Sequence, residues 1–354
     1  MKVALIGPPQ SGKSSLFTAA SGQVHEAAHA GQEQVAVVKV PEPRLELLAE
    51  IEKPKKWTYA TIDLLDTPAI DLSSPAGRNE FNRLVPSLRD CNGLVAVVRA
   101  FDDPSVPPHR GRIDPAADLK ELHGELIFAD LAQVANRLER LDDKRRKRNR
   151  LEESEKREHA LLSRCQEALE AERPVREVIE TDQDERTVRS FAFLTLKPLV
   201  VVVNVGEAEA AEPRPIAAMA AYEPLYVCAK VEAEIAQLDP ADRPAFLADL
   251  GLAQPARDRL VHAIYQRIGL IAFLTGGPQE VRAWALPAGT PAIEAAGNIH
   301  TDMARGFIRA EVVAYDDLAD AGDMKAAKAA GKVRLEGKQY ILQDGDVVLF
   351  RFNV

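Results

Sequence analysis

Near the beginning of the chain the sequence reads Gly7-Pro8-Pro9-Gln10-Ser11-Gly12-Lys13-Ser14. This run matches the pattern G-x-x-x-x-G-K-[ST] and lies between a short aliphatic segment, residues 3–6, and a segment with helical character, residues 13–21. Its glycines let the backbone curl so that successive N–H groups point toward phosphate oxygens. The beginning of a helix adds the positive end of its dipole. The run therefore predicts a phosphate-binding loop between a buried strand and a helix.

The residue types in this loop indicate a nucleoside triphosphate with Mg²⁺. We expect Lys13 to reach the β- and γ-phosphates and the Ser14 hydroxyl to ligate the metal. Asp66 follows the aliphatic run 61–65, where a carboxylate can hold Mg²⁺ through water, although a strand-end aspartate that makes a turn is the alternative. The loop residues expected to contact the nucleotide are Pro9, Gln10, Ser11, Gly12, Lys13, Ser14 and Ser15.

Continuous rather than alternating aliphatic runs recur along the first two thirds of the chain. Such runs are typical of parallel strands covered on both faces, and helical stretches separate them, so the predicted fold class is α/β. The runs lie at residues 3–6, 61–65, 93–98, 199–203 and 225–227.

The base-reading residues are expected after the later strands. Asn204-Val205-Gly206-Glu207 follows the run 199–203, where GTPases carry N-K-x-D. There the aspartate accepts the N1–H and N2–H₂ of guanine, whereas here Val205 replaces the lysine and Glu207 replaces the aspartate. Adenine lacks both donors, so the substitution favours ATP and leaves GTP as the alternative. Cys228-Ala229-Lys230 is the expected final base-contacting loop.

Residues 119–171 have a different pattern and lack glycine and proline apart from Gly124. Apolar residues recur with alternating spacings of four and three, which is a heptad seam, and a shorter apolar stripe follows at residues 162, 165 and 169. We therefore expect two antiparallel helices that form a coiled-coil hairpin inserted into the α/β domain. The seam consists of Ile127, Leu131, Val134, Leu138 and Leu141.

A basic cluster lies near the expected tip of this hairpin. Residues 137–150 contain eight cations and three acids. A solvated helix face with i,i+4 ion pairs is the simple interpretation, but the concentration of cations favours contact with RNA phosphates. No aromatic residue interleaves with them, so base stacking is not expected. The predicted RNA-binding patch consists of Lys144, Arg145, Arg146, Lys147 and Arg148.

Length and composition limit the remaining possibilities. The 354 residues correspond to two or three domains, and the net charge of −9 argues against a protein that coats nucleic acid with its whole surface. The three cysteines form no C-x-x-C pair, which fits a reducing compartment. No apolar run approaches the ~20 residues needed to span a bilayer. We expect a cytoplasmic protein without a membrane partner, and a monomer, although no pattern determines the oligomeric state.

The last 85 or so residues, with frequent glycine and proline, predict a small α+β domain. Short β-like runs recur there, at residues 307–312, 339–342 and 347–350. The predicted domains are a P-loop domain at 1–118 and 190–268, an inserted helical hairpin at 119–189, and a C-terminal domain at 269–354.

Two C-terminal segments are especially specific, Glu280-Val281-Arg282-Ala283-Trp284 and Gly306-Phe307-Ile308-Arg309-Ala310. Together with eight other segments they resemble the Obg-like ATPases of the YchF type, in the right order over essentially the whole chain. The resemblance implies a P-loop domain, an inserted coiled coil and a C-terminal TGS domain of β-grasp type. It also implies slow ATP hydrolysis, an ATP preference through N-x-x-E, and association with ribosomes. The other segments are 7–15, 41–45, 193–198, 204–207, 228–232, 295–302, 344–347 and 352–354.

The sequence departs from this family in its switch regions. The glycine of the D-x-x-G element is Ala69, preceded by Pro68, and the glycine-rich segment that follows is shortened to residues 70–77. Residues 28–34, the expected first switch, contain no threonine to ligate Mg²⁺. The nearest match to a family histidine that would act in catalysis is His109, displaced by about one position; an exposed loop histidine is the alternative.

These features lead to one main expectation and two alternatives. The main expectation is an ATP-binding P-loop protein that acts as a slow Mg²⁺-dependent ATPase on the ribosome or RNA, with Lys13 as its principal catalytic residue. The first alternative is a nucleotide-sensing binding module with little catalysis, which the altered switches favour. The second is a GTP-binding protein.

Overall fold

The structure is a computed structural model that describes residues 1–23, 33–148, 151–239 and 241–353. The chain forms two compact units, Met1–Ala36 with Asp63–Leu260 and Val37–Ile62 with Val261–Val354. Among the described residues, no helix has the length and apolar character needed to cross a membrane.

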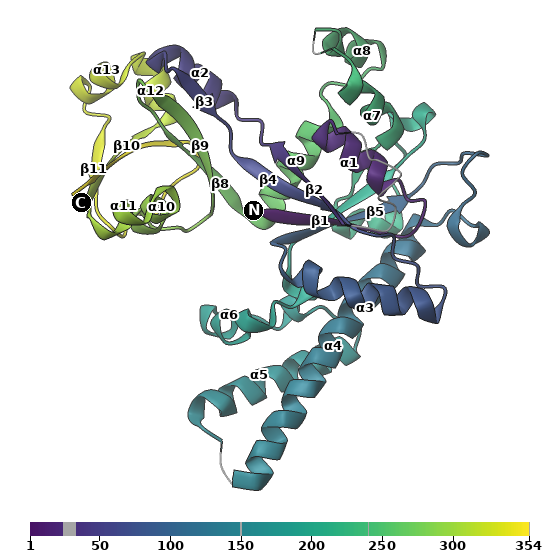
Figure 1. Cartoon of the computed structure of the whole chain (residues 1–354). Helices are drawn as coiled ribbons and strands as arrows, with labels where there is room; N and C mark the ends of the chain where they lie inside the picture. Colours follow the sequence, from purple (N-terminus) through teal and green to yellow (C-terminus); the bar gives the residue numbers. More distant parts are fainter. Residues whose placement is uncertain (24–32, 149–150, 240, 354) are drawn as a thin grey trace. The chain divides into compact units, whose positions relative to one another are not determined.

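The first unit is built on a six-stranded sheet with the order β2-β4-β1-β5-β6-β7 (Figure 1). β1 pairs in parallel with both β4 and β5, and β6 pairs in parallel with both β5 and β7. The five predicted strands and the α/β class are therefore confirmed, whereas β2 was not predicted. The strands are β1 (Lys2–Ile6), β2 (Gln34–Lys39), β4 (Thr61–Asp66), β5 (Gly93–Arg99), β6 (Leu199–Asn204) and β7 (Leu225–Val227).

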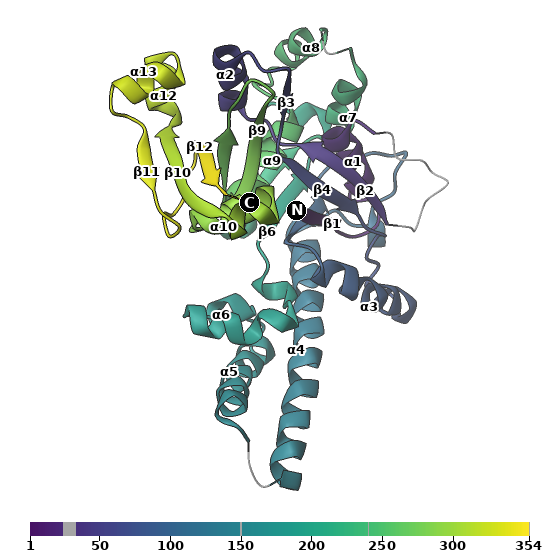
Figure 2. The same ribbon diagram turned by 60° about the vertical axis from the view of Figure 1, so that its left-hand side comes forward.

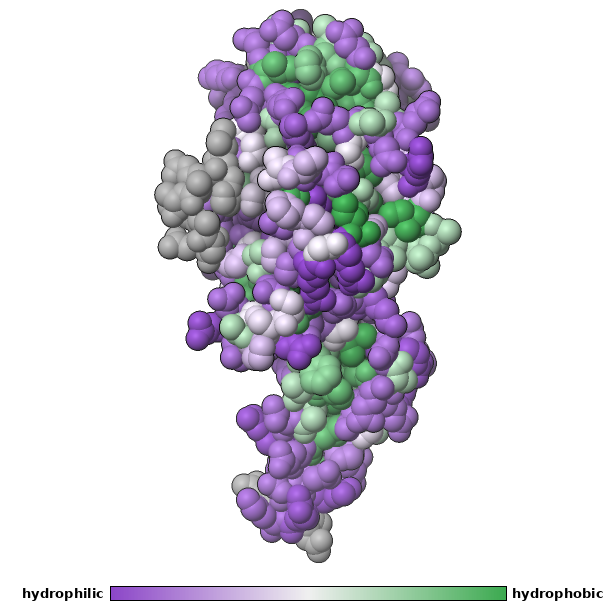
Figure 3. All heavy atoms as spheres, turned by 90° about the vertical axis from the view of Figure 1, so that its right-hand side faces the viewer, coloured by the Kyte–Doolittle hydropathy of each residue, from purple (hydrophilic) through white to green (hydrophobic). Residues whose placement is uncertain are grey.

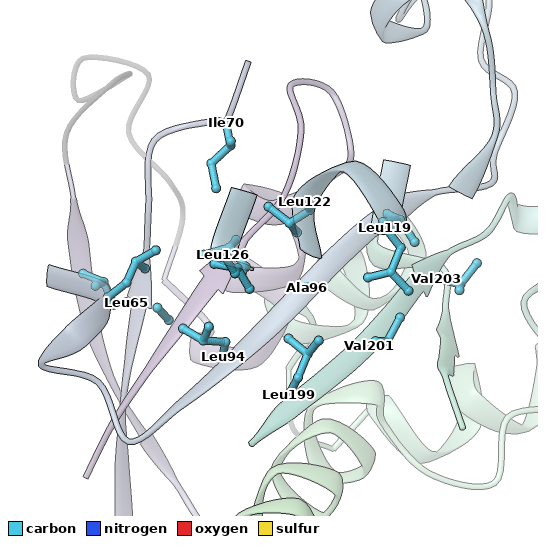
Figure 4. Close-up of a cluster of buried hydrophobic side chains, with 14 of the residues drawn as sticks. Leu65, Ile70, Leu94, Ala96, Leu119, Leu122, Leu126, Leu199, Val201 and Val203 are labelled. Atoms are coloured by element: carbon cyan, nitrogen blue, oxygen red, sulfur yellow. The ribbon is translucent and has the colours of Figure 1, made fainter. Parts of the chain in front are cut away.

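The continuous aliphatic runs form strands because helices cover both faces of this sheet. Every residue of β5 and β6 is buried, as expected for central parallel strands. Figure 4 shows one face, where Leu94, Ala96 and Val201 of the strands meet Leu122 and Ile70. The helices that begin in the first unit are α1 (Lys13–Ser21), α3 (Pro75–Arg89), α4 (Pro115–Arg148), α5 (Glu153–Glu170), α6 (Asp182–Val188), α7 (Ala229–Gln237), α8 (Arg243–Asp249) and α9 (Ala256–Ile268).

The predicted helical hairpin consists of α4 and α5, which lie side by side in opposite directions (Figures 1 and 2). The beginning of α4 packs on the sheet through Leu119, Leu122 and Leu126. Further along the helix, the predicted seam packs against the apolar stripe of α5. One continuous helix thus joins the sheet of the first unit to the end of the hairpin. The members of this second core include Ile127, Val134, Leu138 and Leu141 from α4, with the partly buried Leu131 packed against them, and Leu162, Cys165 and Leu169 from α5.

Asp130 ties α4 to the chain that returns from the hairpin. Its side chain is fully buried and accepts hydrogen bonds from the Leu194 amide at 3.0 Å and the Thr195 amide at 2.8 Å. The Thr195 hydroxyl donates to it at 2.9 Å, and the Arg89 guanidinium lies 3.1 Å away. A buried carboxylate is tolerated in a core only with such a set of partners.

The second unit contains a mixed six-stranded sheet with the order β11-β10-β12-β8-β9-β3. β8 pairs antiparallel with β9 and parallel with β12, and β12 pairs antiparallel with β10. The predicted α+β character of this region is therefore present. The strands are β3 (Lys56–Thr58), β8 (Leu270–Thr275), β9 (Glu280–Pro287), β10 (Phe307–Ala314), β11 (Arg334–Glu336) and β12 (Asp346–Phe352), and the helices are α2 (Pro43–Glu52), α10 (Ala292–Ile299), α11 (Thr301–Arg305), α12 (Tyr315–Ala321) and α13 (Met324–Ala329).

One β-like run of the C-terminal region is not a strand. Residues 339–342 make only an isolated bridge, between Ile341 and Pro291. The reason is that the beginning of α10 takes the backbone partners of this run. The Ala292 amide donates to the Tyr340 carbonyl at 2.8 Å, and the Leu342 amide donates to the Thr290 carbonyl at 3.2 Å.

Residues 37–62 pack with the C-terminal region although they come early in the chain. β3 pairs in parallel with β9, and Leu45 and Leu48 of α2 are fully buried. The Arg44 guanidinium binds Glu42 and, at 2.7 Å, Asp344. The predicted domain boundaries, which assign this segment to the P-loop domain, stay a prediction.

Candidate nucleotide-binding site

The P-loop has the backbone that its glycines predict. Gln10 and Gly12 adopt left-handed conformations, with φ of 59° and 90°, and α1 begins at Lys13. A Cβ atom at Gly12 would lie 2.0 Å from Asn204 Nδ2, and one at Gly7 would lie 2.3 Å from the Val97 carbonyl oxygen. Only glycine fits both places, because a side chain there would meet polar atoms of β5 and β6.

Lys13 lies inside this loop with only 6% of its surface exposed. Burial lowers the pKa of its ammonium group, and the nearby Asp66 carboxylate opposes that shift. A buried lysine at a helix N-terminus is poised for an anionic ligand, because an anion restores the favourable environment that the ammonium lost on burial.

Ser14 and Asp66 lie next to one another, as the predicted metal site requires. The Ser14 hydroxyl donates a hydrogen bond of 2.9 Å to Asp66 Oδ2. Asp66 is buried at the end of β4. A hydroxyl and a carboxylate are the hard oxygen ligands that Mg²⁺ prefers, and Mg²⁺ characteristically uses few protein ligands beside phosphate and water. The two side chains therefore fit Mg²⁺ bound together with a nucleotide.

Asn204 joins the P-loop to residues 228–230, the loop that was expected to contact the base. Its Nδ2 donates to the Ser11 carbonyl at 3.0 Å, and its Oδ1 accepts from the Ala229 amide at 2.9 Å. The Ser11 hydroxyl is buried without a hydrogen-bond partner among the described residues. Three segments far apart in sequence, residues 7–14, 204–207 and 228–230, thus meet at one edge of the sheet.

The residues after Asn204 divide between core and surface. Val205 is buried in the hydrophobic core, and its amide donates to the Val227 carbonyl at 2.9 Å. Glu207 is exposed, and its carboxylate lies 2.7 Å from Lys230 Nζ. Cys228 is buried, which raises the pKa of its thiol. The Glu207–Lys230 pair was not predicted, because it joins two loops whose approach depends on the fold.

A second unpredicted feature is the loop after β5. Arg99 is buried and donates to three backbone carbonyls of this loop, those of Phe101 at 3.0 Å, Val106 at 2.7 Å and Pro107 at 3.4 Å. Its guanidinium lies 4.1 Å from the centroid of the Phe101 ring. A Cβ atom at Gly206 would lie 3.9 Å from Phe101. Arg99 therefore holds an aromatic residue beside the loop 204–207.

The second switch region is packed against the P-loop and α4. The Ile70 amide donates to the Gly7 carbonyl at 3.0 Å, and the Ile70 side chain is buried beside Leu122 (Figure 4). His109 lines a small cavity with Pro8 and Ile70, and its Nε2 lies 3.4 Å from Asp71 Oδ1. Most of the expected first switch, residues 28–32, lies outside the described residues.

The basic patch carries ion pairs on three of its five members. Arg145 lies 3.1 Å from Asp142 and Arg146 lies 2.7 Å from Asp143 along the helix, whereas Lys144 pairs with Glu155 of α5. Lys147 is exposed, and the Arg148 side chain lies outside the described residues. Figure 3 shows hydrophilic side chains over this end of the hairpin. The simple interpretation of paired surface charge therefore accounts for part of the patch.

Comparison with known proteins finds relatives that match this chain over its whole length. A family model named YchF-GTPase_C, described as a protein of unknown function (DUF933), matches residues 270–353. The chain is 40% identical over 365 residues to the ribosome-binding ATPase YchF of Bacillus subtilis, and the match covers 99% of this chain and 98% of that protein. The chain belongs to the YchF family. The resemblance predicted from sequence is thereby confirmed.

Other members of the YchF family extend the comparison to eukaryotes and to solved structures. Obg-like ATPase 1 of Caenorhabditis elegans is 30% identical over 367 residues, which cover 100% of this chain and 92% of that protein. The structure of the Schizosaccharomyces pombe YchF GTPase matches with a TM-score of 0.83 and 25% identity, over 99% of this chain and 97% of that one. The predicted P-loop fold is confirmed. The names of these YchF relatives include both ATPase and GTPase.

Proposed function

We propose that this chain binds a purine nucleoside triphosphate with Mg²⁺ in its P-loop and hydrolyses the β–γ bond slowly. The observation that carries the proposal is the convergence at one sheet edge of the Lys13 ammonium, the Ser14–Asp66 pair and the Asn204 side chain. The left-handed backbone at Gln10 and Gly12 supplies the curled loop that amide donors need.

The roles of the residues follow from their positions. The P-loop amides and Lys13 would bind the phosphate oxygens and stabilise charge that develops there during transfer to water. Ser14 and Asp66 would hold Mg²⁺, which supplies further charge neutralisation when bound. Asn204 would fix the distance between the phosphate loop and the base loop, since one amide group bonds to both.

Slow hydrolysis is favoured by the second switch. Ile70 follows Ala69 of the D-x-x-G element, and its apolar side chain is buried in the core and has no group that can orient water. His109 lines the same small cavity as Pro8 and Ile70, together with the charged residues Arg110, Asp118 and Glu121, and we retain it as the candidate water-orienting residue. The competing function is a nucleotide sensor with little catalysis. Single-turnover hydrolysis with and without ribosomes separates the two.

We expect ATP to bind more tightly than GTP. Glu207 is occupied by Lys230, and its carboxylate offers adenine no matching donor. Glu207→Asp shortens this side chain and should bring its carboxylate closer to the position that the aspartate has in GTPases. We expect GTP affinity to rise by about tenfold, the equivalent of one charge-assisted hydrogen bond. Direct titration of both nucleotides against wild-type and variant protein measures the ratio.

The matched control is Glu209→Asp, which makes the same change two residues further along and should leave the ATP/GTP ratio unchanged. Tighter binding of GTP than ATP by the wild-type chain would refute the ATP assignment and leave the P-loop assignment intact.

We further propose that the chain binds ribosomes, as the bacterial relatives are named to do. The charged end of the hairpin is the candidate contact. Phosphate binding there would have to displace the pairs of Lys144, Arg145 and Arg146, which is inexpensive because surface ion pairs contribute about 0–1 kcal/mol each.

Reversing the charge of Lys144, Arg145, Arg146 and Lys147 to glutamate should therefore release the protein from ribosomes at a lower salt concentration. Co-sedimentation across a salt series measures this, because each lost phosphate contact reduces the salt dependence of binding. The control reverses four exposed cations elsewhere in the first unit and thereby matches the change in net charge. Equal release by both variants would show that only total charge matters. The control residues are Lys120, Arg173, Arg186 and Arg189.

A further inference from the structure

Trp57 is an exposed aromatic residue on an edge strand. It lies in the middle of β3, the last strand of the second sheet, and 55% of its surface is exposed. The other tryptophan, Trp284, packs on Phe273 at 6.2 Å between ring centroids and donates to Thr275 Oγ1 at 3.0 Å. Burial of a tryptophan contributes much to stability, so the exposure of Trp57 points to a surface role.

Lysines surround this tryptophan. Lys53, Lys55 and Lys56 precede it and are all exposed. Because side chains alternate across an extended strand, Trp57 lies on the face of β3 opposite Lys56 and Thr58, and Lys55 and Tyr59 flank the strand on either side. Lys39 is also exposed, and its Nζ lies 5.8 Å from the centroid of the Tyr59 ring. We call these six residues the Lys–Trp patch: Lys39, Lys53, Lys55, Lys56, Trp57 and Tyr59.

The nearest carboxylates do not cancel this charge. Glu280 accepts from the Thr58 hydroxyl at 2.5 Å and lies 3.7 Å from Lys56, on the face of β3 opposite Trp57. Glu46 accepts from the Tyr59 hydroxyl at 2.8 Å. Within the described residues, no carboxylate lies within ion-pair distance of Lys39, Lys53 or Lys55. The patch thus keeps at least three cations available beside an open aromatic face.

We propose that the Lys–Trp patch binds single-stranded RNA, with a base stacked on Trp57 and phosphates on the lysines. Cations interleaved with exposed aromatic rings are the chemistry of single-strand recognition, since a ring offers every base a stacking surface and the ammonium groups follow the backbone. This surface belongs to the second unit and shares no residue with the hairpin patch, so it adds to the ribosome contact proposed above without depending on it. An acidic protein segment would need the charges but not the stacked ring.

Binding of a fluorescein-labelled oligouridylate of about ten nucleotides to the full chain, followed by fluorescence polarisation, tests the proposal. Trp57→Leu should weaken binding about tenfold, because it removes the stacking surface but not the charge. Changing Lys53, Lys55 and Lys56 to glutamine should reduce the slope of log affinity against log salt by about two, at about 0.7 per phosphate contact.

Stacking has its own spectroscopic readout. The difference between the emission spectra of wild-type protein and Trp57→Leu isolates Trp57, since the chain has two tryptophans, and RNA should quench this difference. Trp57→Phe should retain part of the affinity. Unchanged affinity in Trp57→Leu, or no quenching, would overturn the proposal.

The remaining outcomes are equally decisive. If polyglutamate binds as tightly as RNA and competes with it, the surface is a site for acidic proteins and the RNA assignment fails. If the hairpin charge reversal abolishes all RNA binding and the Trp57 and lysine variants do not alter it, the ribosome proposal stands and this one falls. Single-stranded DNA of the same length shows whether the sugar contributes.

Discussion

Replacing Lys13 with alanine is expected to abolish nucleotide binding at physiological concentrations. The ammonium group lies buried at the beginning of α1. Loss of a buried charge that binds an anion costs about 2–5 kcal/mol, which corresponds to a decrease in affinity of about 30-fold to several thousand-fold. Isothermal titration with ATP and Mg²⁺ measures the loss directly.

A second readout separates lost binding from lost folding. Burial lowers the pKa of Lys13, so the charged ammonium is disfavoured in the nucleotide-free protein, and removing it should not lower the Tm of that form. The Tm increase that ATP gives the wild type should be missing from the variant. Lys120→Ala, an exposed lysine of α4, should keep both the affinity and the Tm increase. ATP affinity retained in Lys13→Ala would refute the site.

Replacing Asp130 with alanine is expected to cause the largest loss of stability among the residues discussed. The change leaves two buried backbone amides and the Thr195 hydroxyl without their acceptor and leaves Arg89 without its carboxylate. Removing one partner of a buried ion pair costs about 3–5 kcal/mol. The midpoint of urea unfolding, followed by circular dichroism, reports the loss.

Two further variants show whether the loss of stability comes from the contacts of Asp130: one changes the same residue, and the other changes an exposed residue of the same helix. Asp130→Asn keeps one acceptor oxygen and should lose less stability than the alanine variant. Glu139→Ala removes an exposed carboxylate of α4 and should change the free energy of unfolding by less than about 0.5 kcal/mol. A similar loss from Asp130→Ala and Glu139→Ala would mean that the contacts of Asp130 do not hold the hairpin to the sheet.

Strands and helices whose residue pattern repeats over a short stretch of chain were predictable from sequence. The aliphatic runs 3–6, 94–98 and 199–203 of β1, β5 and β6 are continuous because both faces are buried, and the α4 seam repeats because one face packs on α5. β3 was not predicted because it is only three residues long and its partner β9 lies far along the chain. Thr58 and Glu280, which are hydrogen-bonded, are 222 positions apart. No local pattern records such a pairing.

In the candidate site, too, a continuous motif was predictable from sequence, whereas contacts between distant segments were not. The loop 7–14 is a continuous motif whose conformation depends on its own glycines, so its residues could be named from sequence. The Asn204 bridge and the Glu207–Lys230 pair form only when three loops converge. The side chain of Val205 packs into the core, and its expected contact with the nucleotide stays a prediction. Arg99 was missed since a buried arginine without a carboxylate partner has no sequence signature.

The length of α4 has a mechanical consequence. Its first turns pack on the sheet beside Ile70, and the same rigid rod continues to Arg148. From Leu126 to that end the rod extends about 33 Å at 1.5 Å per residue. A tilt of about 5° at the base would move the far end by about 3 Å. The hairpin would thus act as a lever arm with its base beside Ile70 and the P-loop residue Pro8, so that a small tilt there becomes a displacement as large as a hydrogen bond is long.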